Sequence, residues 1–314
     1  SAVVIAPDEI RRARKIIDGF ALRTPLVRLD VDSEQELWLK LEVLQPVRSF
    51  KVRGAANAIL QASAADLAHG VVTASAGNMA QGVAYVARSR GVRSTIVVPE
   101  HAPQAKLDAI ERYGGTVVRV SYDEWWNALV TGRCDGIDGL FVHPVADERV
   151  MAGNGTIGLE LLEQLHGFDA VVVPYGGGGL VTGIASAVKA ARPEVRVVSA
   201  EPATGAPAAA SLGGGTVDFT PSFVDGAGSR ELLPRVWERA SQLLDDALAI
   251  PLDDVAAAIR LLAERTRVVA EGAGALAVAA AVSGRAGGRR IVCIVSGGNI
   301  DSAVFARILA GETP

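Results

Sequence analysis

The sequence predicts an α/β protein built on parallel sheet that helices cover on both faces. Three observations lead to this prediction. Short runs rich in Val and Ile alternate with Ala-rich stretches of helical character, the runs are apolar throughout, and several end in Ser, Gly or Pro just before the next helix. A continuously apolar strand is typical of a sheet buried on both faces, because both sets of its side chains lie in the interior.

The predicted strands follow one another at residues 70–75, 94–100, 115–121, 169–175, 195–201 and 290–296. Ligands of open α/β sheets bind at the carboxyl ends of the strands. The turns that begin near positions 75, 99, 176 and 296 are therefore the places where we expect chemistry.

The composition argues against several classes of function. With 314 residues, 49% of them hydrophobic and 21% charged, the chain can bury a large core. A net charge of −4 without basic blocks argues against nucleic acid as a partner, and no apolar stretch reaches the roughly 20 residues that span a bilayer. The only cysteines, Cys134 and Cys293, suit reduced thiols, which favours a cytoplasmic protein.

Lys51 is a candidate nucleophile. Only five of the 31 basic residues are lysines, so this chain generally uses arginine for positive charge. Arginine cannot lose its proton to act as an amine nucleophile, whereas a partly desolvated lysine can form an imine. Lys51 follows Ser49 and Phe50 and leads a helix-like run. A solvated surface lysine is the alternative that this pattern leaves open.

Four consecutive glycines follow the strand at 169–175 and precede a helix: Gly176, Gly177, Gly178 and Gly179. Such a loop lets backbone N–H groups point into one concavity, and the helix N-terminus adds its positive end, which is typical of a phosphate site. A flexible linker is the alternative. The run GNGTIG at 153–158 matches a dinucleotide-binding pattern but follows polar residues rather than a strand. We interpret it as a loop and the start of a helix.

Two more turns follow predicted strands. The turn Ser75-Ala76-Gly77-Asn78 precedes an amphipathic helix, whose N-terminus favours a carboxylate; an N-cap turn without a ligand is the alternative. The turn Ser296-Gly297-Gly298-Asn299 either offers a hydroxyl to a ligand ring or is only a turn. Neither His nor Cys residues cluster at metal-ligand spacing, and no Ser-His-Asp or HExxH context is present. We therefore expect no metal site and no Ser-His catalysis.

The chain resembles the fold-type II pyridoxal-phosphate enzymes in six segments that follow in order: TPL at 24–26, SFKVRGA at 49–55, SAGNMAQ at 75–81, GNGTIGLE at 153–160, PYGGGGL at 174–180 and SGGN at 296–299. The resemblance runs almost end to end. It is strongest to the threonine and serine dehydratase (threonine ammonia-lyase) branch, which also contains serine racemase. It implies the fold of the tryptophan synthase β-subunit, with two open, twisted, mostly parallel sheets and helices on both faces.

The resemblance implies a role for each turn. Lys51 would carry pyridoxal 5'-phosphate as a Schiff base, Phe50 would pack near the pyridine ring, and the loop of Gly176, Gly177, Gly178 and Gly179 would hold the phosphate. Asn78 would hydrogen-bond the ring hydroxyl, and Ser296 would face the ring nitrogen. The substrate carboxylate would bind at the turn formed by Ser75, Ala76, Gly77 and Asn78. Met79 would lie beside this turn.

The implied activity is dehydration and deamination of a β-hydroxy amino acid, of the L-threonine or L-serine type, to a 2-oxo acid and ammonia. The freed Lys51 amine would remove the Cα proton, and loss of the β-hydroxyl would give an aminoacrylate. A neutral Ser296 cannot keep the ring nitrogen protonated as a carboxylate would, which favours prompt loss of a β leaving group. In the family that the chain resembles, racemases have Ser at the position of Ala76. The resemblance therefore favours dehydration over racemisation.

Several positions depart from the family pattern. Arg48 stands where Gly is usual; it either covers the surface or recognises a second carboxylate. Met79 stands where His is usual; it either makes the substrate pocket more apolar or packs under the helix. Asn154 replaces a common Gln. Some relatives bind a divalent cation through a Glu and an Asp six residues later, but these positions are Glu201 and Pro207, so we expect no such site.

We expect two α/β domains with the cofactor between them. The larger would comprise residues 1–69 and 147–314, and the smaller, residues 70–146, would carry the carboxylate turn and close over substrate by analogy. The expected partner is a small-molecule amino-acid substrate, and we expect no binding to nucleic acid or membrane. Enzymes of this kind are usually homodimers, so we expect a homodimer. The alternatives are an amino-acid racemase or β-replacement synthase on the same scaffold, and an amino-acid-binding protein without chemistry.

Overall fold

A computed structural model describes residues 4–314, which form two helix-covered sheets. The larger sheet has the order β1-β2-β10-β7-β8-β9 and the smaller one β5-β4-β3-β6. Within the described residues, β1 runs antiparallel to β2, and the other pairings between these strands are parallel. The predicted α/β fold class is therefore confirmed. The strands are β1 (Leu26–Arg28), β2 (Glu36–Leu41), β3 (Val71–Ala74), β4 (Ser94–Pro99), β5 (Thr116–Val120), β6 (Leu140–Phe141), β7 (Ala170–Pro174), β8 (Arg196–Pro202), β9 (Asp246–Ile250) and β10 (Arg290–Val295).

All six predicted strands are confirmed, as β3, β4, β5, β7, β8 and β10. Four strands were not predicted from the sequence, namely β1, β2, β6 and β9. Three of these lie at the edge of a sheet, where a strand does not need a continuous apolar run. The fourth, β2, contains Lys40, a charged residue that is nevertheless fully buried.

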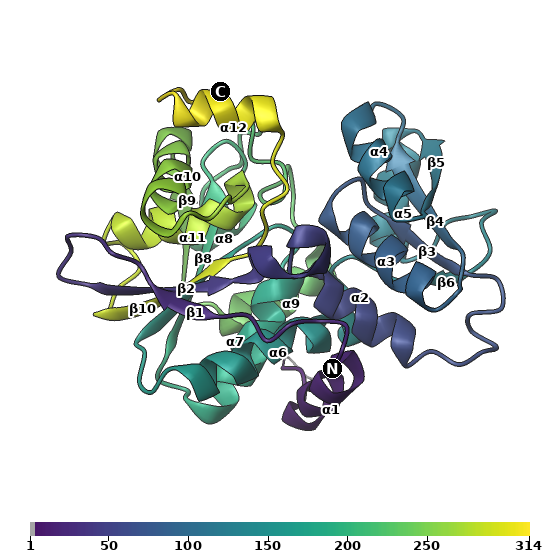
Figure 1. Ribbon diagram of the computed structural model, residues 1–314, viewed down its shortest axis with the longest axis horizontal. Coiled ribbons are helices and arrows are strands. Elements are labelled where there is room, and N and C mark those ends of the chain that lie inside the picture. Colours follow the sequence, from purple (N-terminus) through teal and green to yellow (C-terminus); the bar gives the residue numbers. More distant parts are fainter. Residues whose placement is uncertain (1–3) are drawn as a thin grey trace.

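Helices separate most of the strands. Figure 1 shows α3, α4 and α5 with the small sheet in one lobe, and the remaining sheet with its helices in the other. Among the described residues no helix combines the length and apolarity needed to cross a membrane. The helices are α1 (Pro7–Ile17), α2 (Lys51–Leu60), α3 (Asn78–Ser89), α4 (Gln104–Arg112), α5 (Tyr122–Thr131), α6 (Glu148–Gln164), α7 (Gly179–Ala191), α8 (Pro207–Gly213), α9 (Pro234–Leu243), α10 (Leu252–Thr266), α11 (Gly272–Val282) and α12 (Ser302–Leu309), with short 3₁₀ turns η1 (Glu42–Leu44) and η2 (Pro46–Arg48).

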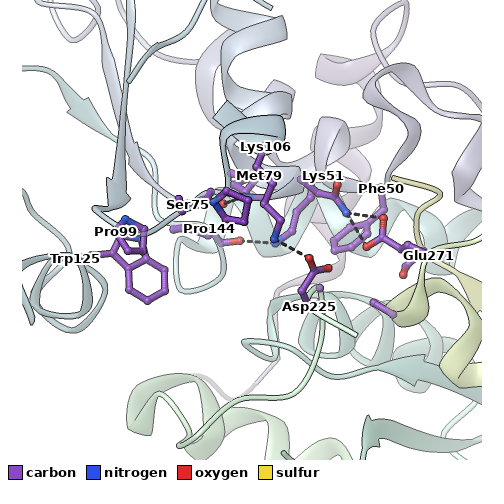
Figure 2. Close-up of a pocket in the computed structure, with 18 of the residues that line it drawn as sticks. Phe50, Lys51, Ser75, Met79, Pro99, Lys106, Trp125, Pro144, Asp225 and Glu271 are labelled. Atoms are coloured by element: carbon purple, nitrogen blue, oxygen red, sulfur yellow. Dashed lines mark hydrogen bonds and ion pairs between the residues drawn. The ribbon is translucent and has the colours of Figure 1, made fainter. Parts of the chain in front are cut away.

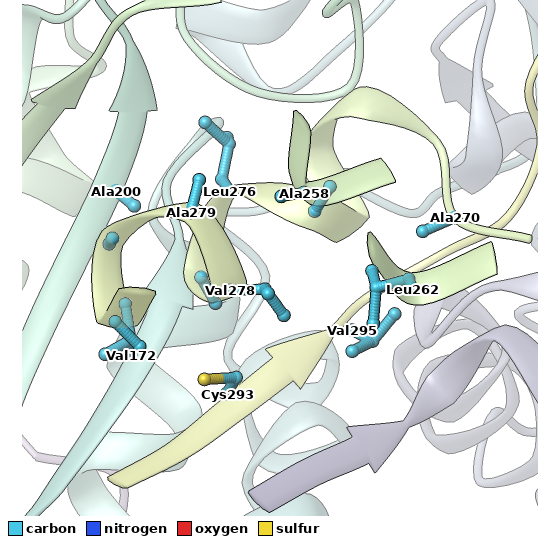
Figure 3. Packing of buried hydrophobic residues seen from close by; sticks show 14 of the residues in the cluster. Val172, Ala200, Ala258, Leu262, Ala270, Leu276, Val278, Ala279, Cys293 and Val295 are labelled. Atoms are coloured by element: carbon cyan, nitrogen blue, oxygen red, sulfur yellow. The ribbon is translucent and has the colours of Figure 1, made fainter. Parts of the chain in front are cut away.

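Alternate residues of the large sheet pack into two different cores. Val172 and Cys293 face α10 and α11, whereas their neighbours Val171 and Val292 face α6, α7 and α9. Figure 3 shows the first core, in which Cys293 lies beside Val278 of α11. Both cysteines are free thiols. The apolar run at 273–282 is therefore explained by burial: α11 lies inside the large lobe.

The interpretation of residues 153–158 as a loop and helix start was wrong. The segment lies inside α6, which begins at Glu148 after an Asp147 N-cap. Its glycines allow close helix contacts, because a Cβ on Gly153 would lie 2.5 Å from the carbonyl oxygen of Arg53, and one on Gly158 would lie 2.7 Å from the Cβ of Ala187. These glycines therefore serve the packing of α6 against α2 and α7.

Candidate active site

A cavity of about 440 Å³ is lined by residues from both lobes. A smaller cavity of about 50 Å³ shares Phe50, Lys51 and Ser296 with it and is lined by Gly176, Gly177, Gly178 and Gly179. The structure thus brings every residue predicted for the site to one place, while the role of each stays a prediction. Those that line the larger cavity are Phe50, Lys51, Ser75, Ala76, Gly77, Asn78, Met79 and Ser296.

Lys51 is the first residue of α2, so its side chain leaves the helix at the end that faces the cavity. Its Nζ donates to the carbonyl oxygen of Pro144 at 3.2 Å and lies 5.2 Å from the centroid of the Phe50 ring (Figure 2). Burial disfavours the ammonium and lowers the pKa of Lys51 to about 8, although the Glu271 carboxylate opposes this shift. An amine of this pKa can give and take a proton near neutral pH.

The turn that leads to Lys51 is strained. Val47 and Arg48 both have a φ of 58°, in the left-handed region that costs a non-glycine residue about 1–2 kcal/mol. The segment after β10 holds this turn, because the Gly298 amide donates to the Arg48 carbonyl (2.9 Å) and the Asn299 side chain donates to the Val47 carbonyl (2.7 Å). The Arg48 side chain is exposed and stands outside the residues that line the cavity, which favours the surface interpretation.

The four-glycine loop connects β7 to α7. Gly178 has a φ of 92°, which favours glycine. A Cβ on Gly177 would lie 2.5 Å from a side-chain carbon of Val145, and a Cβ on Gly179 would lie 2.7 Å from its carbonyl oxygen. The first N–H groups of α7 have no acceptor within the helix. The loop is therefore a backbone-lined hollow at a helix N-terminus, which suits an anion.

The turn before α3 meets the large lobe through Asn78. The Gly77 amide donates to the Ser75 hydroxyl at 3.2 Å, which closes the turn. The Asn78 side-chain amide donates to both carboxyl oxygens of Glu271, each at 3.1 Å, and its oxygen accepts from the Asn299 side chain at 2.8 Å. Asn78 is therefore held in one orientation at the junction of the lobes.

Glu271 lines the cavity and was missed by the sequence analysis. It is the N-cap residue of α11, only 4% exposed, and also accepts from the Asn299 amide at 2.9 Å. Burial disfavours the carboxylate and raises the pKa of Glu271 to about 7. The signal in the sequence was a single acid, Glu271, placed between apolar residues and a helix start rich in small residues. The sequence analysis considered the neighbouring run at 273–282 only for its hydrophobicity.

An ion pair across the cavity was also missed. Lys106 of α4 lies 2.7 Å from Asp225, which belongs to the segment between α8 and α9 of the large lobe. Figure 2 shows this ion pair among the residues that line the cavity. The two residues are far apart in sequence, and no motif connects them.

The structure defines the surroundings of two positions that were compared with the family pattern, Met79 and Glu201. Met79 is 1% exposed and packs in the core with α3 neighbours such as Val83. It also borders the cavity, and its effect on a substrate pocket stays a prediction. The Glu201 carboxylate accepts from the amides of Ala208 (3.2 Å) and Ala209 (3.0 Å) at the start of α8. Burial raises the pKa of Glu201 to about 7.

Glu271→Gln is expected to lower the pKa of Lys51 below about 8, because a neutral amide no longer stabilises the ammonium. The measurement is the pH dependence of Lys51 modification by a small amine-reactive reagent in ligand-free protein. Peptide mass spectrometry gives the modified fraction at each pH. Glu9→Gln, at an exposed position, is the control. An unchanged titration in Glu271→Gln would contradict the assigned interaction.

The same variant tests the effect of burial on stability. A carboxyl whose pKa rises from 4.5 to about 7 on folding contributes stability below pH 4.5 and loses it as the pH rises through about 7. The unfolding free energy of the wild type should therefore fall more steeply over this range than that of Glu271→Gln.

Comparisons with known proteins agree along nearly the whole chain. A family model described as pyridoxal-phosphate dependent enzyme matches residues 17–297. The L-threonine ammonia-lyase of Thermotoga maritima is 38% identical over 315 residues, covering 98% of this chain and 78% of the relative. The serine racemase of Arabidopsis thaliana is 35% identical over 312 residues, covering 93% and 92%. The structure of maize serine racemase matches with a TM-score of 0.87 at 32% identity, covering 99% and 98%.

Proposed function

Because the chain belongs to the family of pyridoxal-phosphate dependent enzymes, we propose that it converts a β-hydroxy amino acid of the L-threonine or L-serine type to a 2-oxo acid and ammonia. Its cofactor is pyridoxal 5'-phosphate, and its relatives include L-threonine ammonia-lyases. The observation that carries the proposal is the Lys51 amine, which has a pKa of about 8 and lines both the main cavity and the hollow of the glycine loop.

The residues present fit the cofactor. Its phosphate requires N–H donors without side chains in the way, and Val145 leaves no room for a Cβ at Gly177 or Gly179. Phe50 and Ser296 border the two cavities beside Lys51. When bound, the cofactor supplies an electron sink that acidifies the Cα–H bond of the substrate.

Different parts of the cavity would then have different roles in the reaction. The N-terminus of α3, at the turn Ser75–Asn78, binds and orients the substrate carboxylate. The Lys51 amine takes the proton from the substrate Cα, for which a pKa near neutrality is suitable. Departure of the β-hydroxyl as water leaves an unsaturated amino acid, which hydrolyses to the 2-oxo acid and ammonia.

A panel of amino acids tests this function. L-threonine, L-serine, a 3-hydroxyaspartate and an aryl-serine are each incubated with the holoenzyme, and 2-oxo acid, ammonia and the opposite enantiomer are measured. We expect equimolar 2-oxo acid and ammonia, formed faster than the enantiomer. Release from no panel member, despite bound cofactor, would favour a β-replacement synthase, and faster formation of the enantiomer would favour a racemase.

Ala76→Ser is expected to raise the formation of D-serine from L-serine by roughly tenfold or more, because it adds a proton donor to the carboxylate turn. Ala76 lines the cavity and has no exchangeable side-chain proton, which is the reason we favour dehydration. Chiral chromatography of the reaction mixture gives the rate. Ala76→Gly is the matched control, since it changes the same position without adding a hydroxyl. D-serine formation that is equally fast in the wild type and Ala76→Ser would contradict this role for position 76.

A further inference from the structure

Residues 143–146 contact both parts of the candidate active site. The carbonyl oxygen of Pro144 is the acceptor that the described structure gives to Lys51 Nζ, at 3.2 Å. The next residue, Val145, lies against the glycine loop so closely that Gly177 and Gly179 have no room for a Cβ. One short segment thus sets the surroundings of the amine and the shape of the phosphate hollow.

His143 holds this segment in place from within. Its Nδ1 accepts from the backbone amides of Val145 (3.1 Å) and Ala146 (2.8 Å), while its Nε2 lies 2.7 Å from the carbonyl oxygen of Leu129 in α5. Backbone amides can only donate and a carbonyl can only accept, so the ring proton must be on Nε2. The three bonds therefore define one tautomer and one ring orientation.

The surroundings of His143 preserve this neutral form. The side chain is 7% exposed, and its ring meets that of Phe141 edge to face, with centroids 6.0 Å apart. Burial disfavours the imidazolium and lowers the pKa of His143, although the carbonyl of Leu129 and the Asp147 carboxylate oppose this shift. A protonated Nδ1 would also confront two backbone donors. His143 is thus suited to be a permanent acceptor rather than a group that exchanges protons.

We propose that His143 is a positioning residue: its Nδ1 fixes residues 143–146 so that the Pro144 carbonyl holds the Lys51 amine and Val145 supports the glycine loop. This inference rests on the proposed function only for the identity of the cofactor. Without the Nδ1 acceptor, the amides of Val145 and Ala146 lose their partner, and the segment must rearrange to find another.

Two substitutions separate the two nitrogens of the ring. The carbonyl oxygen of Asn can take the place of Nδ1, so His143→Asn keeps the acceptor for the two amides and loses the bond to Leu129. The amide nitrogen of Gln can take the place of Nε2, so His143→Gln keeps the bond to Leu129 and loses the acceptor. His166→Gln, at an exposed histidine, is the matched control.

The first measurement is the equilibrium affinity of the cofactor-free protein for pyridoxal phosphate, followed by absorbance. We expect His143→Gln to weaken binding by about tenfold or more and His143→Asn by less than about threefold, relative to wild type and His166→Gln. Wild-type affinity in His143→Gln would overturn the proposal. Equal losses in the two variants would also overturn it, because Leu129 rather than the segment would then matter.

The second measurement distinguishes positioning from a general loss of stability. The pKa of Lys51, obtained from the pH dependence of its chemical modification without cofactor, should fall below about 8 in His143→Gln, since the ammonium loses the Pro144 carbonyl. It should stay near 8 in His143→Asn. If His143→Gln does not fold, His143→Asn still decides, because a tenfold loss of affinity in that variant contradicts the proposal. Neither measurement uses substrate, so a different catalysed reaction leaves the test intact.

Discussion

Lys51→Ala is expected to lower the rate of 2-oxo acid formation by at least about a thousandfold, because it removes both the amine that binds the cofactor and the base that takes the Cα proton. The holoenzyme should absorb near the visible edge, and borohydride should fix the cofactor on Lys51. Both signals should be lost in the variant, by spectroscopy and by peptide mass spectrometry respectively.

Lys15→Ala is the matched control, since Lys15 is an exposed lysine of α1. It should retain wild-type colour and activity. Suppose that the wild type makes 2-oxo acid and Lys51→Ala retains more than about a tenth of its rate. This result would show that another group takes the proton. Loss of unfolding cooperativity in Lys51→Ala would be detected separately, by denaturant titration.

Much of the fold could be predicted because parallel sheet has a clear signature. Strands buried on both faces are apolar throughout, and this is why β7 and β10 were predicted almost to the residue. The strand β2 was missed because Lys40 and Glu36 make it look polar. Lys40 is buried through an ion pair with Glu160, which is 120 positions away, and no local pattern reports such a partner.

The site was predicted to the extent that its residues lie in motifs. Lys51, the glycine loop and the turn before α3 each follow from local chemistry and meet at the cavity. Glu271, Lys106 and Pro144 contribute through tertiary contacts alone. A carbonyl oxygen such as that of Pro144 has no side-chain signature at all, and its position depends on how His143 holds the segment.

A buried network of four charged residues connects the start of α2 to α6 and the large sheet. Arg53, two residues after Lys51, is 1% exposed and donates to Glu42 at 2.6 and 2.9 Å. It also donates to Glu160 through both terminal nitrogens, one of them at 3.1 Å. Lys40 completes the network with a 2.8 Å bond to Glu160. Two cations and two carboxylates thus balance each other in the interior, where each residue is at most 4% exposed.

Arg53→Met is expected to lower the free energy of unfolding by about 3–5 kcal/mol, the cost of leaving a buried charge without its partner. Methionine fills much of the arginine volume, so packing alone should not produce such a loss. Urea titration at neutral pH, followed by circular dichroism, gives the difference. A loss below about 1 kcal/mol would mean that water reaches the network, as it does for exposed ion pairs.

Acid should reduce this difference. Burial by itself would raise the pKa of Glu160, but hydrogen bonding and charge from Arg53 and Lys40 hold it below the usual 4.5. A carboxyl with a depressed pKa contributes stability that is fully present above 4.5 and is lost as the pH falls through the folded value. Wild type and Arg53→Met should therefore converge at low pH. Arg11→Met, which breaks an exposed pair with Asp8, should match wild type at every pH. Replacing Lys40, Glu42, Arg53 and Glu160 together with apolar residues should recover much of the loss, because no buried charge then lacks a partner.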